Sequence, residues 1–361
     1  MTTRLRLPVV PARWRRPITV GLVVLTALAV VANAVVATPT VGPPVDFELF
    51  GPAGFWGVPF LLGVQSPLGW IVFGIVVATL LSIAFAWLAE RLLRPLSPTW
   101  SVPLAVVPAL ITAISGQTAQ AISVGHPAEY IVPLMWIEAA MLARRGSAFA
   151  AAVVLAATAG WELWGLLGLP VLLLAPRIDL RTVVRSALGG ITALLVLFAP
   201  FALLGPFHMF SFSWPIYDNT LAHLLFPDET TFPWPLRLTQ GVLALGGGAV
   251  TAWLTRRRVD AVWLVPLMVC AIRLFTDPVL ARYYAIPLLM MAVLGLVLAI
   301  AQRSLAVFLA CLVMFNVLVD VELTVVTAGL MLVLVIATVV VVVVRSGSRA
   351  SRTPNPVGAA R

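Results

Sequence analysis

The chain has 361 residues, of which 61% are apolar and only 10% are charged. This composition excludes a water-soluble domain built around a single core, and the long apolar runs lack the alternation of barrel strands. Because backbone groups in hydrocarbon are satisfied within helices, we expect an all-α, polytopic transmembrane protein. The net charge of +9 arises from arginines in short clusters between apolar runs. This pattern indicates membrane topology rather than a nucleic-acid-binding surface.

Apolar runs long enough to cross a bilayer predict about twelve spans, with ten as the lower count. In chain order we expect spans near 17–37, 67–89, 100–116, 128–143, 147–161, 163–176, 186–204, 236–254, 259–275, 283–301, 304–319 and 322–344. Gly116, Pro127 and Gly160 interrupt otherwise apolar sequence, so short, tilted or broken helices are expected among them.

The arginines give this order of spans an orientation. With the amino terminus inside, all but three of the 23 arginines fall on the cytoplasmic side, and most acidic residues fall outside. We therefore expect a multi-pass protein of the plasma (inner) membrane with both termini in the cytoplasm. Residues 1–345 are predicted to form one helical domain with outer loops at 38–66 and 205–235. The Ser-, Pro- and Arg-rich tail at 346–361 is predicted to be disordered.

The first outer loop carries two acids, Asp46 and Glu48. A carboxylate at this position is a candidate general base that removes a proton from an attacking acceptor hydroxyl. The alternative is a pair of solvated loop acids.

Two further acids lie where spans are predicted to begin or turn on the outer side. Glu129 follows His126 at the start of a helix, whose free N–H groups form an anion site. The alternative is that Glu129 complements the helix dipole while His126 caps the turn. Glu162 lies between two tryptophans at a turn, where it either binds a polar substrate or simply reaches interfacial water.

The loop at 205–235 is dense in aromatic residues with interspersed polar ones, including His208 and Asp218. This pattern is typical of a surface segment that covers a cavity or holds a sugar and a lipid tail, and equally of an aromatic belt. No two of the three histidines share a metal-ligand spacing, so the sequence predicts no metal site.

A short outer turn places Arg273 before, and Arg282 and Tyr283 after, a proline-containing bend. Two fixed positive charges at the membrane surface are suited to hold a lipid phosphate and to stabilise it as it departs. A structural salt bridge from Asp277 to Arg282 is the alternative. Arg273 needs a partner in either case, because it lies in the last turn of a span.

The order of several short motifs resembles the multi-spanning GT-C glycosyltransferases, nearest the actinobacterial α-mannosyltransferases that use a polyprenyl-phosphate donor. The motifs are Gly116-Gln117, Gly125-His126-Pro127 with Glu129, Arg144-Arg145-Gly146, the segment from Ala159 to Trp164, and Leu169-Pro170. The likeness covers about residues 100 to 290, and it implies a GT-C-like helical fold.

The resemblance implies transfer of a sugar, with mannose favoured, from a polyprenyl-phosphate donor to a lipid or glycan acceptor on the outer face. It maps the base onto Asp46, with Glu48 second, and the phosphate contacts onto Arg273 and Arg282. Tyr283 is expected to contact the donor phosphate as well, and the sugar and acceptor are expected near His126, Glu129, Glu162, His208, Asp218 and Tyr283. No cofactor is expected. A carrier or flippase for a lipid-linked saccharide and a non-catalytic envelope-assembly protein are the alternative functions.

Overall fold

The computed structural model describes residues 12–36, 67–115, 126, 128–204 and 213–350 of the chain. In chain order, its longer helices are α1 (Ala12–Val36), α4 (Pro67–Leu93), α5 (Ser101–Ile114), α7 (Ala128–Arg144), α8 (Ala148–Trp161), the 3₁₀ helix η2 (Leu163–Leu174), α9 (Leu180–Leu204), α11 (Trp234–Thr255), α12 (Leu264–Thr276), α13 (Ile286–Ala301), α14 (Leu305–Asp320) and α15 (Val325–Ala350). Short elements are β1 (Trp214–Pro215), α10 (Leu221–Leu225), β2 (Thr231–Phe232), η4 (Val259–Ala261) and η5 (Arg282–Ala285).

The almost entirely helical character expected from the sequence is confirmed for the described residues. The described residues include five helices that are long and apolar enough to cross a membrane, and five shorter apolar ones. The five long stretches are Arg15–Ala32, Ile75–Leu93, Leu180–Ala199, Arg282–Ala301 and Val325–Arg345. A helix also lies over each of the shorter expected ranges, but a count of twelve spans stays a prediction.

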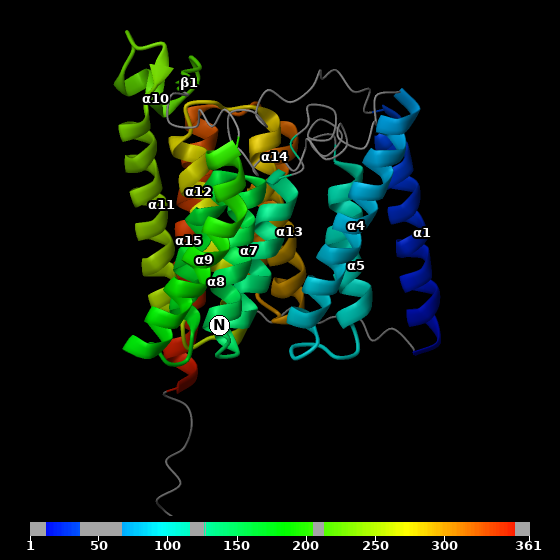
Figure 1. Cartoon of the computed structure of the whole chain (residues 1–361). Helices are drawn as coiled ribbons and strands as arrows, with labels where there is room; N and C mark the ends of the chain where they lie inside the picture. Colours follow the sequence, from blue (N-terminus) through cyan, green and yellow to red (C-terminus); the bar gives the residue numbers. More distant parts are fainter. Residues whose placement is uncertain (1–11, 37–66, 116–125, 127, 205–212, 351–361) are drawn as a thin grey trace, which may run out of the picture.

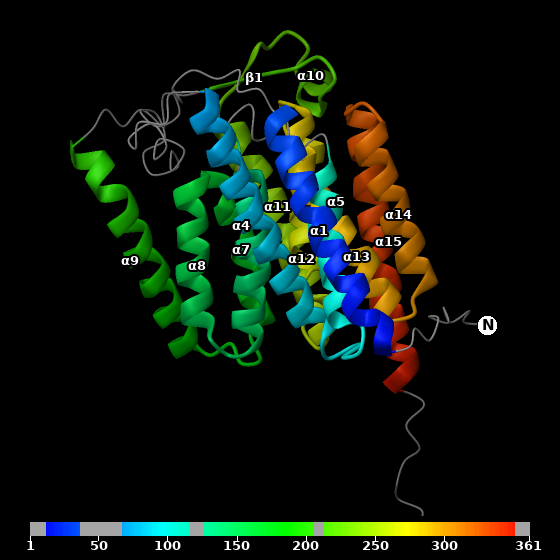
Figure 2. The same cartoon turned by 90° about the vertical axis from the view of Figure 1, so that its right-hand side faces the viewer.

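The helices pack side by side with their axes roughly along one direction (Figures 1 and 2). The beginning of α1 and the end of α15 lie at one end of the bundle, the lower end in both views. The helices α4, α7 and α11 run toward this end, and a cluster of arginines lies at the end of each. We therefore call it the arginine-rich end. The opposite end, which carries β1, α10 and β2, is the loop end.

The centre of the bundle is α13, which contacts α5, α7, α12 and α14 and is buried along almost its whole length. By contrast, α1 and α9 present most of their apolar side chains outward, as helices in contact with lipid do. At the arginine-rich end, an ion pair between Arg91 and Glu138 joins α4 to α7. The polar residues of the loop end are therefore held on a tightly packed central group of helices.

The tight packing of η2 depends on two glycines. A Cβ atom on Gly165 would lie 2.7 Å from the backbone carbon of Thr158, and one on Gly168 would overlap the indole ring of Trp136. The Trp136 Nε1 donates a hydrogen bond of 2.7 Å to the Gly165 carbonyl oxygen. Glycine lets these backbones approach closely, as is common between helices in membranes. This approach places Glu162, between α8 and η2, at the loop end.

Two short strands, β1 and β2, pair in the segment before α11. Trp214 pairs with Phe232 and Pro215 with Thr231 in an antiparallel ladder. At the other end of the chain, α15 continues to Ala350, beyond Ser346, where we expected a disordered tail to begin.

Candidate functional site

The candidate site is organised by η5, a single turn at the loop end whose first three side chains reach three different groups. Arg282 lines a cavity, Tyr283 stacks on His126, and Tyr284 lies under the guanidinium of Arg273. The turn precedes α13, whose Pro287 suits the first turn of a helix. One short turn therefore connects a cavity, a stacked imidazole and a buried charge.

A buried ion pair joins Glu129, in the first turn of α7, to Arg273, in the last turn of α12. Arg273 donates from Nη1 to Oε2 at 2.8 Å and from Nη2 to Oε1 at 2.9 Å. The two residues are 1% and 6% exposed. Such a two-point geometry is the strongest form of this contact, and it supplies the partner that Arg273 needs at the end of a span.

Aromatic rings enclose the Arg273 guanidinium on both sides. Its Cζ lies 3.9 Å from the ring centroid of Trp164 and 4.9 Å from that of Tyr284. The faces of aromatic rings attract cations, most strongly where water is excluded. Glu129 therefore binds both terminal nitrogens of Arg273, and the rings of Trp164 and Tyr284 lie against its guanidinium.

A second network lies beside this pair and corrects one alternative left open by the sequence. Asp277 accepts a hydrogen bond of 3.2 Å from Arg237 and lies 3.9 Å from the Nε of Arg273, and it forms no ion pair with Arg282. Arg237 also donates to Gln240, whose side-chain nitrogen donates to the Arg273 carbonyl oxygen. Two of the three arginines outside the basic clusters are thus tied into one network by Asp277.

His126 and Tyr283 form the second part of the site. Their rings are parallel within 8°, with centroids 4.6 Å apart. The His126 Nδ1 lies 3.8 Å from a carboxylate oxygen of Glu162, an ion pair whenever the imidazole is protonated. The structure therefore brings together three residues that the sequence assigned to sugar, acceptor or donor binding.

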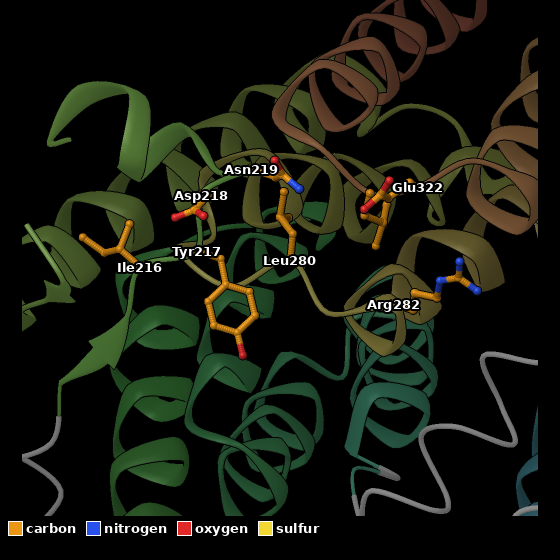
Figure 3. A pocket seen from close by; sticks show the side chains of 8 residues that line it. Ile216, Tyr217, Asp218, Asn219, Leu280, Arg282 and Glu322 are labelled. Carbon is orange, nitrogen blue, oxygen red and sulfur yellow. The ribbon is translucent and has the colours of Figure 1, made fainter.

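A cavity of about 480 Å³ forms the third part (Figure 3). Asp218 and Asn219 line it from the segment between β1 and α10, Leu280 and Arg282 line it from the segment around η5, and Glu322 lines it from the connection between α14 and α15. Arg282 and Asp218, both predicted site residues, therefore share one cavity. Within the part of the chain that the structure describes, Arg282 forms no hydrogen bond or ion pair.

Some predicted site residues lie outside the described part of the chain, and some residues of the site were not predicted. Asp46, Glu48 and His208 lie outside the described residues. Trp164 and Tyr284, which hold Arg273, and Glu322, which lines the cavity, had no assigned role in the sequence. The signal that would have found Glu322 is an acid directly before an apolar span on the side opposite the arginine clusters.

Among the described residues, no three His, Cys, Asp or Glu side chains are grouped to hold a metal ion. Cys270 and Cys311 are both buried free thiols. The arrangement can bind an anion at Arg282 and polar groups across the cavity and the His126 stack. No family model, no curated protein and no solved structure matches the chain.

Proposed function

We propose that the chain is a membrane glycosyltransferase. It moves a sugar, mannose by the resemblance of its motifs, from a polyprenyl-phosphate donor to a lipid or glycan acceptor. We assign the loop end to the outer face of the plasma membrane and the arginine-rich end, with both termini, to the cytoplasm. Apolar helices, basic clusters at one end and clustered polar residues at the other support this assignment.

The observation that carries the proposal is the position of Arg282. Its guanidinium is exposed at the loop end, lines a cavity and is bound by no acid among the described residues. A free guanidinium offers paired donors to phosphate oxygens and stabilises the negative charge that builds up as the phosphate leaves. Arg282 therefore takes the role of donor-phosphate contact.

Arg273 takes a different role, because Glu129 already binds both of its terminal nitrogens. Its ring contact with Tyr284 fixes η5, and η5 carries Arg282. Arg273 is thus a positioning residue that acts through the turn. Tyr283 follows Arg282 in the chain and stacks on His126, which lies beside Glu162. These three residues supply groups that bind sugar hydroxyls.

The transfer step needs a base on the outer side. The acceptor hydroxyl oxygen forms a bond to the anomeric carbon as the bond from that carbon to the phosphate oxygen breaks, with inversion. Its proton passes to a carboxylate, and polyprenyl phosphate leaves. Asp46, with Glu48 second, is the base predicted from the sequence.

The placement of the buried charges favours an enzyme over a carrier for a lipid-linked saccharide. A carrier commonly holds its substrate near the middle of the membrane, between interrupted helices. Glu129 and Arg273 instead lie in the first turn of α7 and the last turn of α12, both at the loop end. The charges are therefore gathered where a reaction at one surface requires them.

Purified protein incubated with radiolabelled polyprenyl-phosphate mannose and a membrane lipid extract tests the proposal. We expect label in a new product with wild type, about a hundredfold less with Arg282→Gln, and none with Asp46→Ala. Arg257→Gln, an exposed arginine at the opposite end, is the matched control and keeps full activity. Absence of product with wild type across lipid extracts, despite a folded protein, would favour a non-catalytic envelope protein.

A further inference from the structure

The cavity at the loop end is lined by charges of both signs. Arg282 contributes a guanidinium, and Asp218 and Glu322 contribute carboxylates (Figure 3). The three side chains come from segments far apart in the sequence, and all three are exposed. Leu280 and Leu323 add an apolar part of the wall.

Backbone hydrogen bonds fix the walls of this cavity. The Tyr217 N–H donates to the Pro278 carbonyl oxygen at 2.9 Å, and the Val325 N–H donates to the Asn219 carbonyl oxygen at 2.8 Å. These bonds tie the outer loop to the segment before η5 and to the first residue of α15. The charged groups are thus carried on a preorganised frame, which lowers the entropy lost on binding.

The oppositely charged side chains of the cavity do not pair with one another within the described part of the chain. Within the described part of the chain, neither Asp218 nor Glu322 forms an ion pair with Arg282, and neither carboxylate accepts a hydrogen bond. A phosphate alone, such as that of the proposed sugar donor, pairs with Arg282 but leaves the two carboxylates unpaired, and an amine alone leaves the guanidinium unpaired. Charge complementarity therefore selects a ligand that carries both charges.

The position of the cavity along the bundle suits a ligand with two charged groups that is held in the membrane. Arg282 begins the apolar stretch Arg282–Ala301, and Glu322 shortly precedes the apolar stretch Val325–Arg345. Residues at the starts of such stretches lie at the level of lipid headgroups. The charged groups of a membrane-bound ligand would contact the charged part of the wall. Its apolar stem would contact the leucines.

We infer that this cavity binds a zwitterionic phospho-amine group, with its phosphate on Arg282 and its ammonium on Glu322 and Asp218. The inference uses the same Arg282 that the proposed function assigns to the donor phosphate, but it does not depend on sugar transfer, because binding of such a group requires no reaction. Two sources offer this chemistry at a membrane surface. One is the headgroup of an ethanolamine phospholipid, and the other is a phosphate-linked amino sugar.

Isothermal titration calorimetry on the purified full chain in a non-ionic detergent tests the inference. The probes are phosphoethanolamine and glucosamine 1-phosphate, compared with inorganic phosphate and ethanolamine. We expect at least one phospho-amine to bind about tenfold more tightly than either single-charge probe, from one added charge-assisted contact. This preference should fall as salt is raised, because the groups are exposed.

Two variants distinguish binding of the ammonium from binding of the phosphate. Glu322→Gln should weaken the phospho-amine about tenfold without weakening inorganic phosphate, whereas Arg282→Gln should weaken both. Asp228→Asn, an exposed acid of the same loop outside the cavity lining, is the control and should change nothing. An unchanged melting temperature for each variant shows that the fold is kept.

The two probes distinguish the sources, since preference for phosphoethanolamine indicates a phospholipid headgroup and preference for glucosamine 1-phosphate indicates an amino sugar. Equal affinity for phosphate and both phospho-amines, or a Glu322→Gln variant with wild-type affinity, would overturn the inference. This result is independent of the transfer assay, so a failed zwitterion site and a failed transferase can be told apart.

Discussion

Glu129 and Arg273, which are 144 positions apart in the chain, form a buried two-point ion pair that joins the start of α7 to the end of α12. Charged side chains this far from water persist only where both partners are present and well oriented. The pair therefore fixes the loop end of two central helices. Through Tyr284, which lies under Arg273, it also fixes η5.

Breaking the pair on one side should be strongly destabilising. Glu129→Gln and Arg273→Gln each leave one charge buried without its partner, and we expect each to lower the free energy of unfolding by about 3–5 kcal/mol. The double variant Glu129→Leu with Arg273→Met removes both charges and should recover most of this loss. Thermal unfolding in detergent measures the effect, and single variants as stable as wild type would refute the role of the pair.

The glycines of η2 allow a second prediction about packing. Gly168→Ala places a methyl group against the indole ring of Trp136, and we expect a loss of about 1–3 kcal/mol from overpacking. Gly246→Ala in α11 is the matched control, since nothing lies within 4 Å of the added Cβ, and it should be neutral or slightly stabilising. Equal melting temperatures for the two variants would contradict the close approach of η2 and α7.

We expect the aromatic ring of Tyr283, which stacks on His126, to be needed for the proposed sugar transfer. Tyr283→Phe keeps the ring and should retain most activity, whereas Tyr283→Ala removes the stack and should lower kcat/KM by about tenfold, the value of one aromatic contact. The radiolabel assay measures both. Similar losses in the two variants would assign the role to the phenol hydroxyl instead.

At the arginine-rich end, Asp179 caps α9 and gives a pH-dependent signal. Its carboxylate accepts a hydrogen bond of 2.7 Å from the Thr182 N–H, and this contact lowers the pKa of Asp179 below its ordinary value. The cap therefore contributes its full stabilisation of the folded chain at any pH above the pKa that this carboxyl has in the unfolded chain. That contribution is lost as the pH falls through the lower pKa of the folded state.

Hydrogen exchange at the start of α9 measures this cap. Protection of the Thr182 amide should fall on acidification through the folded pKa in wild type. Asp179→Asn keeps a capping oxygen that does not titrate, and its protection should not share this fall. A wild-type profile identical to that of Asp179→Asn would show that the carboxylate is not the capping group.

The sequence predicted the helices closely because each is marked by an apolar run whose ends carry polar or turn residues. The 3₁₀ helix η2, Leu163–Leu174, lies entirely within its expected range of 163–176, and Glu162 lies at the expected turn. The end of α15 differs, since the helix continues into the Ser- and Arg-containing segment up to Ala350. Composition alone does not show where a helix that leaves the bilayer stops.

The candidate site was only partly predictable, because its partners are remote in sequence. The expected charges of Glu129, Arg273 and Arg282 do lie at the loop end. No local pattern shows that the first two bind each other while the third forms no ion pair with any described residue. Asp277 is closer in the chain to Arg282 than to Arg237, yet it pairs with Arg237. Only packing of α11 against α12 determines that choice.

We propose that the loop end, with Arg282 of η5, faces the outside of the cell. A membrane-impermeant maleimide applied to intact cells tests it directly with Arg282→Cys and Arg257→Cys, since the native Cys270 and Cys311 are buried. We predict labelling of the Arg282→Cys protein on intact cells and of the Arg257→Cys protein only after permeabilisation. Labelling of Arg257→Cys on intact cells, with Arg282→Cys protected, would contradict the proposed outer active site.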